Sequence, residues 1–105
     1  MVTEEAIRNF AAEVARRYKP EKIILFGSYA RGTANEDSDV DMLVIMDFEG
    51  RERQMVSEIR SKIRSHFPLD LLVRRAPDIQ WRIKEDDFFL QEVMRQGTIL
   101  YATPH

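Results

Sequence analysis

Two short motifs, a Gly-Ser pair and an Asp-x-Asp triplet, are the parts of this sequence best suited to chemistry. Gly27 and Ser28 follow one apolar run, and Asp39 and Asp41 begin a second apolar run ten residues later. Side chains alternate between the two faces of a strand, so Asp39 and Asp41 are expected to point the same way. Two close carboxylates repel each other unless a cation lies between them, and Mg²⁺ binds carboxylate and phosphate oxygens. Because glycine lets the backbone approach an anion, the pattern predicts a site for a metal-bound nucleoside triphosphate.

A third carboxylate, Asp70, interrupts the apolar run of residues 69–73. If this strand lies beside the strand that contains Asp41, the Asp70 side chain converges on the first two acids. The alternative is a residue at the start of a strand that is hydrogen-bonded to a neighbouring turn.

Arg31 lies between the two motifs and has two interpretations. Its guanidinium group either reaches a phosphate or pairs with Glu36 or Asp37 on the surface. Asp37 is assigned to the loop before the second apolar run and is left out of the metal site.

Residues 27–41, with the sequence GSYARGTANEDSDVD, resemble the Gly-Ser-x10-Asp-x-Asp motif of the nucleotidyltransferase superfamily, which includes DNA polymerase β and kanamycin nucleotidyltransferase. The short chain is most similar to the minimal MntA-like members. The resemblance implies transfer of AMP from ATP to a hydroxyl acceptor. It also implies that Gly27 and Ser28 hold the β- and γ-phosphates, and that two Mg²⁺ ions are bound by three acids, namely Asp39, Asp41 and Asp70.

The same resemblance implies a partner protein. In MntA-like pairs this chain is the antitoxin, and it adenylylates a tyrosine of a HEPN-domain toxin. Two alternatives are a nucleotide-binding antitoxin that acts by occlusion without catalysis, and a small-molecule nucleotidyltransferase that builds its acceptor pocket across a homodimer. The presence of all three acids and of the Gly-Ser pair favours catalysis.

The composition predicts a single domain over residues 1–105. The chain is 44% apolar and 32% charged, as in globular proteins. No apolar run approaches the ~20 residues of a membrane helix. The absence of cysteine excludes disulfides and thiolate zinc sites, and a net charge of −2 argues against direct nucleic-acid binding. A cytoplasmic protein is expected.

A few residues outside the motifs have open roles. Arg74 and Arg75 directly follow an apolar strand, so they form either an anion or partner surface near the site or an ordinary solvated face. Trp81 fits a core role or a partner role. His66 and His105 lack the spacing of a metal-binding pair.

The apolar periodicity predicts alternating helices and strands. Thr3 is a suitable N-cap for the first helix, and the last helix is capped by Asp86 or Asp87 and followed by Gly97 in the C′ position. Pro77 is expected to break the chain, and residues 78–84 fit neither pattern. Helices are expected at 4–18, 52–65 and 86–96, a short helix or turn at 29–33, and strands at 22–26, 40–46, 69–73 and 99–101. This order predicts an α/β (α+β) nucleotidyltransferase fold, with a mixed sheet of about four strands flanked by helices.

Overall fold

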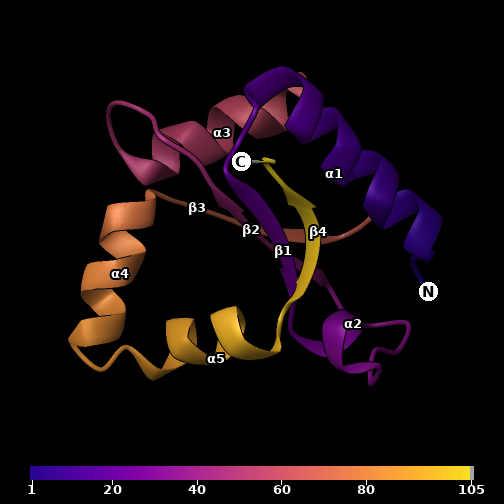
Figure 1. The fold of residues 1–105 in the computed structure, drawn as a ribbon. Coiled ribbons are helices and arrows are strands. Elements are labelled where there is room, and N and C mark those ends of the chain that lie inside the picture. The colour runs from indigo at the N-terminus through magenta and orange to yellow at the C-terminus, as the bar shows by residue number, and fades with distance from the viewer. Residues whose placement is uncertain (105) are drawn as a thin grey trace.

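The computed structural model describes residues 1–104, and His105 lies outside the described residues. The helices are α1 (Glu4–Tyr18), α2 (Ser28–Arg31), α3 (Glu52–Lys62), α4 (Ala76–Lys84) and α5 (Phe88–Gln96), and the strands are β1 (Lys22–Phe26), β2 (Val40–Ile45), β3 (Leu69–Arg74) and β4 (Thr98–Ala102) (Figure 1). The predicted α/β fold with a mixed four-stranded sheet is confirmed. None of the helices within residues 1–104 has the length and apolar character needed to cross a bilayer.

The strands lie in the order β3-β2-β1-β4. β1 is antiparallel to both β2 and β4, whereas β2 and β3 are parallel. Phe26, the last residue of β1, is registered with Asp41, and Asp41 is registered with Asp70 on β3. The end of β1 and the starts of β2 and β3 therefore meet at one end of the sheet.

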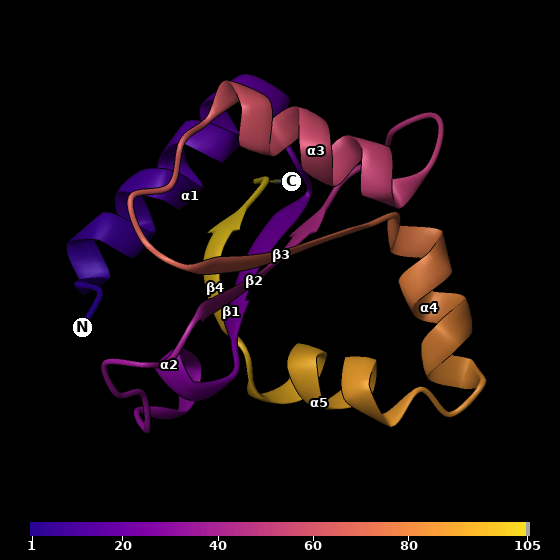
Figure 2. The same cartoon turned by 180° about the vertical axis from the view of Figure 1, so that it is seen from behind.

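Helices cover both faces of the sheet, which explains why the central strands are apolar on both sides. Figures 1 and 2 show α1 and α3 on one face, and α4 and α5 on the other. The first face includes Met42 and Val44, and the second includes Leu43 and Ile45. Because side chains alternate, Asp41 shares the second face with Leu43 and Ile45. The candidate site therefore faces the α4–α5 side.

The strand ends differ from the sequence prediction by at most one residue, and the larger differences are in the helices. Pro77 lies in the first turn of α4 rather than breaking the chain, because proline is tolerated where the N–H groups have no helical acceptor. α3 ends at Lys62, three residues earlier than predicted. Ile63 takes an extended conformation with φ −127°, and its side chain is buried in the core.

Gly97 follows α5 as predicted, but its backbone does not take the left-handed conformation that is common at the C′ position. It has φ −69° and ψ 157°, and its N–H donates to the Val93 carbonyl oxygen at 2.9 Å. A Cβ atom at this position would lie 2.4 Å from Cγ2 of Ile24 and 2.5 Å from the Val93 carbonyl oxygen. Glycine is therefore required because the end of α5 approaches β1 closely.

Candidate active site

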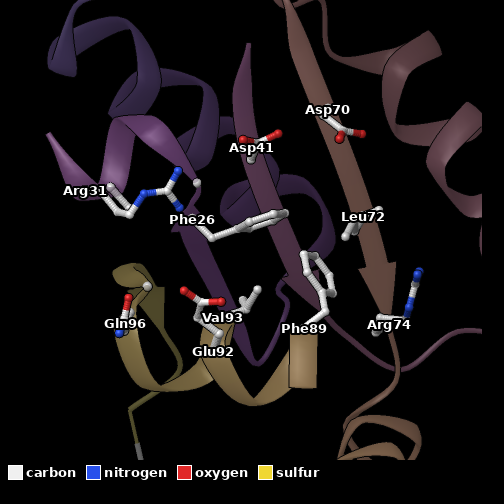
Figure 3. A pocket seen from close by; sticks show the side chains of 13 residues that line it. Phe26, Arg31, Asp41, Asp70, Leu72, Arg74, Phe89, Glu92, Val93 and Gln96 are labelled. Carbon is white, nitrogen blue, oxygen red and sulfur yellow. The ribbon is translucent and has the colours of Figure 1, made fainter. Parts of the chain in front are cut away.

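Asp41 and Asp70 form a pair of neighbouring carboxylates on adjacent parallel strands. Figure 3 shows the two side chains at the rim of one cavity, where they project from β2 and β3. Burial of Asp41, followed by the negative charges of Asp70 and Asp39, raises the pKa of the Asp41 carboxyl group, and the positive charge of Arg31 partly offsets this rise. The pair therefore carries an electrostatic strain that a bound cation would relieve.

Asp39 is placed differently from Asp41. β2 begins at Val40, so Asp39 precedes the strand, and the alternation of strand side chains does not extend to it. Its side chain is exposed and is not among those that line the cavity. Within residues 1–104, no three histidine, cysteine or acidic side chains are grouped closely enough to hold a metal ion. The structure thus brings Asp41 and Asp70 together and leaves Asp39 beside them, close enough for its charge to act on Asp41.

Oxygen ligands of this kind suit Mg²⁺. Asp41 and Asp70 supply carboxylate oxygens that face the same cavity, and their mutual repulsion favours a divalent cation between them. Two of the three predicted acids, Asp41 and Asp70, therefore fit a divalent cation of the kind that the sequence predicts.

Gly27 makes the turn between β1 and α2 in a conformation that is nearly restricted to glycine. It has φ 74° and ψ −154°, and its carbonyl oxygen accepts hydrogen bonds from the N–H groups of Ala30 and Arg31, both at 3.1 Å. A Cβ atom at Gly27 would lie 2.1 Å from Oδ2 of Asp41. The absence of a side chain at Gly27 therefore lets the Asp41 carboxylate lie against the turn, and Ser28 follows as the first residue of α2.

Arg31, at the end of α2, points into the cavity (Figure 3). The ion pairs found among residues 1–104 do not include one between Arg31 and Glu36 or Asp37. Asp37 lies in a loop in which its own N–H donates to Oδ1 of Asn35 at 2.8 Å. Of the two interpretations of Arg31, the structure favours a cationic group at the site over a surface ion pair.

A cavity of about 540 Å³ lies between the sheet face, α2 and α5. Its upper part contains the two acids and Arg31, whereas its lower part combines the apolar side chains of Phe89 and Val93 with the polar side chains of Glu92 and Gln96 (Figure 3). The lining residues are Phe26, Gly27, Ala30, Arg31, Asp41, Asp70, Leu72, Arg74, Phe89, Glu92, Val93, Gln96 and Gly97. The contribution of α5 was not predicted from the sequence. The available signal was the pair of large aromatic side chains at Phe88 and Phe89, which are 73% and 51% exposed.

Arg74 and Arg75 have different roles. Arg74 lines the cavity and pairs with Glu52. The Arg75 guanidinium lies 4.0 Å from the centre of the Phe48 ring, and its Nε donates to the Phe48 carbonyl oxygen at 3.0 Å. Arg75 thus fixes the loop after β2 and is not at the cavity. Trp81 is 63% exposed, so the core role is wrong for it.

Comparisons with known proteins agree with this geometry. A family model described as a nucleotidyltransferase domain matches residues 7–97. A Methanocaldococcus jannaschii chain named as a protein adenylyltransferase, MJ0604, is 30% identical over 103 residues, which cover 96% of this chain and 100% of that relative. The protein adenylyltransferase MntA of Thermococcus cleftensis is 47% identical over 53 residues, which cover 47% of this chain and 52% of the relative.

Solved structures share the fold. A chain from Sulfolobus solfataricus described as a nucleotidyltransferase aligns with a TM-score of 0.64 and 21% identity, over 93% of this chain and 78% of that one. A toxin–antitoxin complex with AMP-PNP contains a chain that aligns with a TM-score of 0.59 and 25% identity, over 91% of this chain and 73% of that one. With the family model matching most of its length, this chain belongs to the nucleotidyltransferase domain family.

Proposed function

We propose that this protein transfers AMP from ATP to a hydroxyl group of a partner protein. The observation that carries this proposal is the registered pair Asp41 and Asp70, which faces a cavity beside the Gly27 turn and Arg31. That arrangement provides anion-binding groups on one side and carboxylates on the other, as a metal-bound triphosphate requires.

Some residues of the site are proposed to bind the phosphates of ATP, and others to hold the metal ion and take part in the reaction. The backbone of Gly27, the hydroxyl of Ser28 and the guanidinium of Arg31 bind the phosphates. Asp39, Asp41 and Asp70 would hold Mg²⁺, which when bound neutralises phosphate charge and lowers the pKa of the acceptor hydroxyl. Asp39 directly precedes β2, and its negative charge acts on Asp41.

The reaction needs no covalent enzyme intermediate. Asp70 accepts the proton of the acceptor hydroxyl, whose oxygen forms a bond to the α-phosphorus of ATP. The bond between the α-phosphorus and the bridging oxygen breaks, and pyrophosphate leaves with the electron pair. Asp70 suits this role because its side chain is exposed at the edge strand β3, where an acceptor can reach it, whereas Asp41 is partly buried.

The acceptor is proposed to be a tyrosine of a HEPN-domain toxin, with this chain as the antitoxin of the pair. Support comes from the relatives, which are named protein adenylyltransferases, and from a structural neighbour that is a toxin–antitoxin complex. The cavity is open to solvent beside Asp70, so a residue on another protein is a suitable acceptor.

Incubation with Mg²⁺, ATP labelled on its α-phosphate, and the protein encoded by the adjacent reading frame tests the proposal. Label on the partner protein supports it. Label on a small molecule indicates the homodimeric alternative, and bound but untransferred ATP indicates occlusion. Asp41→Asn is the control, because it keeps the side-chain shape but removes the charge that the metal requires.

A further inference from the structure

The lower wall of the cavity is built by α5 and carries an aromatic ring, Phe89, that is half exposed. This α5 wall consists of Phe89, Glu92, Val93 and Gln96. Phe89 is 51% exposed although it contacts Phe26, with ring centroids 5.6 Å apart and planes at 81°. The near-perpendicular contact with Phe26 orients the Phe89 ring, which lines the cavity (Figure 3).

The charges around the cavity determine whether the base or the phosphates of a nucleotide can lie against the α5 wall. Glu92 places a carboxylate there, and the last turn of α5, with Gln96 and Gly97, brings the negative end of the helix dipole to the cavity. Both features repel phosphates. Arg31 and the Gly27 turn lie on the opposite side and attract them, so the triphosphate is oriented away from α5.

The α5 wall adjoins the proposed phosphate site through Phe26. Phe26 directly precedes Gly27, and Phe89 contacts Phe26. A group attached to a triphosphate held at Gly27 therefore shares the cavity with the Phe26 and Phe89 rings. A planar base has two π faces, and stacking on an aromatic side chain is its usual apolar contact in proteins.

We infer that the α5 wall is the nucleobase platform of this site, and that Phe89 is the residue on which the base stacks. This inference rests on the proposed function, since it requires that the cavity take a nucleoside triphosphate. It gives α5 a direct part in substrate binding in addition to its part in the core. The contact is to a π face, so it contributes affinity for any nucleobase.

Calorimetry on the full chain with two probes, Mg²⁺-ATP and Mg²⁺-tripolyphosphate, tests the inference. Phe89→Ala is expected to weaken ATP binding by about 5- to 150-fold, the range for loss of one base–aromatic stack. Tripolyphosphate has no base, so its affinity should not change. Phe89→Trp should keep or raise the affinity for ATP, and Phe89→Leu tests the same contact if the alanine variant is unstable.

Phe88→Ala is the matched control, because Phe88 is 73% exposed on the same helix but does not line the cavity. It should leave both affinities unchanged. The inference is overturned if Phe89→Ala and Phe89→Leu bind ATP as the wild type does, if either weakens both probes equally, or if they raise only the KM for the acceptor protein. If the wild type transfers AMP but the Phe89 variants bind ATP normally, only the inference about Phe89 is refuted. If ATP binding depends on Phe89 but the wild type transfers no AMP, only the proposed function is refuted. Wild-type protein that binds neither probe refutes both.

Discussion

Replacement of Gly27 by alanine is expected to damage both the fold and the site. The backbone conformation at Gly27, φ 74° and ψ −154°, is nearly restricted to glycine, and a residue with a Cβ costs about 1–3 kcal/mol there. For a domain of this size, that loss lowers Tm by about 4 to 24 °C. The new Cβ would also lie 2.1 Å from Oδ2 of Asp41, so the carboxylate must move away from its present position beside Asp70. A displacement of about 1 Å at a reacting group can reduce the rate by about 10²-fold.

Gly32→Ala separates these two effects. Gly32 also has positive φ, 76°, but no atom lies within 4 Å of the Cβ position. This variant should therefore lose about 1–2 kcal/mol of stability while keeping wild-type transfer. Thermal unfolding gives the stability of both variants, and transfer of labelled AMP is measured below both transition temperatures. Normal transfer by Gly27→Ala, or an equal loss of transfer in Gly32→Ala, would refute the reasoning.

Three further predictions follow from the same geometry. Asp70→Asn should reduce transfer by about 10²-fold or more through loss of the proton acceptor. Calorimetry should show nearly unchanged Mg²⁺-ATP affinity, because the triphosphate keeps its own ion and its contacts with Gly27 and Ser28. Asp41→Asn should raise the Tm of the metal-free protein at neutral pH. Burial and the neighbouring acids raise the pKa of Asp41, so its ionised form destabilises the fold and its removal stabilises it. An unchanged or lower Tm would contradict this reasoning. Arg75→Ala should lower the unfolding free energy in urea by about 1–3 kcal/mol without changing ATP affinity, since its contacts are with Phe48 and Gly50; weaker ATP binding would place it at the site instead.

The acids could be found from the sequence because each disturbs an apolar strand. Asp41 and Asp70 lie in apolar runs, and burying a carboxylate there costs free energy unless a cation or hydrogen-bond donors compensate its charge. The sequence left open whether the two strands are neighbours, which is the condition for their acids to converge. The parallel register that sets Asp41 against Asp70 depends on the crossover through α3, and only the structure shows it.

Residues whose role depends on distant contacts could not be predicted. Arg75 lies 27 positions from Phe48, and nothing local in the sequence relates the two. Phe89 belongs to a helix whose periodicity indicates a core face, yet about half of its surface is exposed and it lines the cavity. The prediction for Asp39 treated it as part of a strand, but the strand begins one residue later, so its direction is set by the loop.

The central claim is that the cavity beside Asp41 and Asp70 is the site of AMP transfer to another protein. Mass spectrometry of the adjacent-frame partner, after incubation with Mg²⁺-ATP and either wild-type chain or the Asp41→Asn, Asp70→Asn double variant, tests it most directly. The account predicts a tyrosine of the partner carrying one added AMP with the wild type, and an unmodified partner with the double variant. An unmodified partner in the presence of wild-type protein that binds Mg²⁺-ATP, or a modified partner in the presence of the double variant, would contradict it.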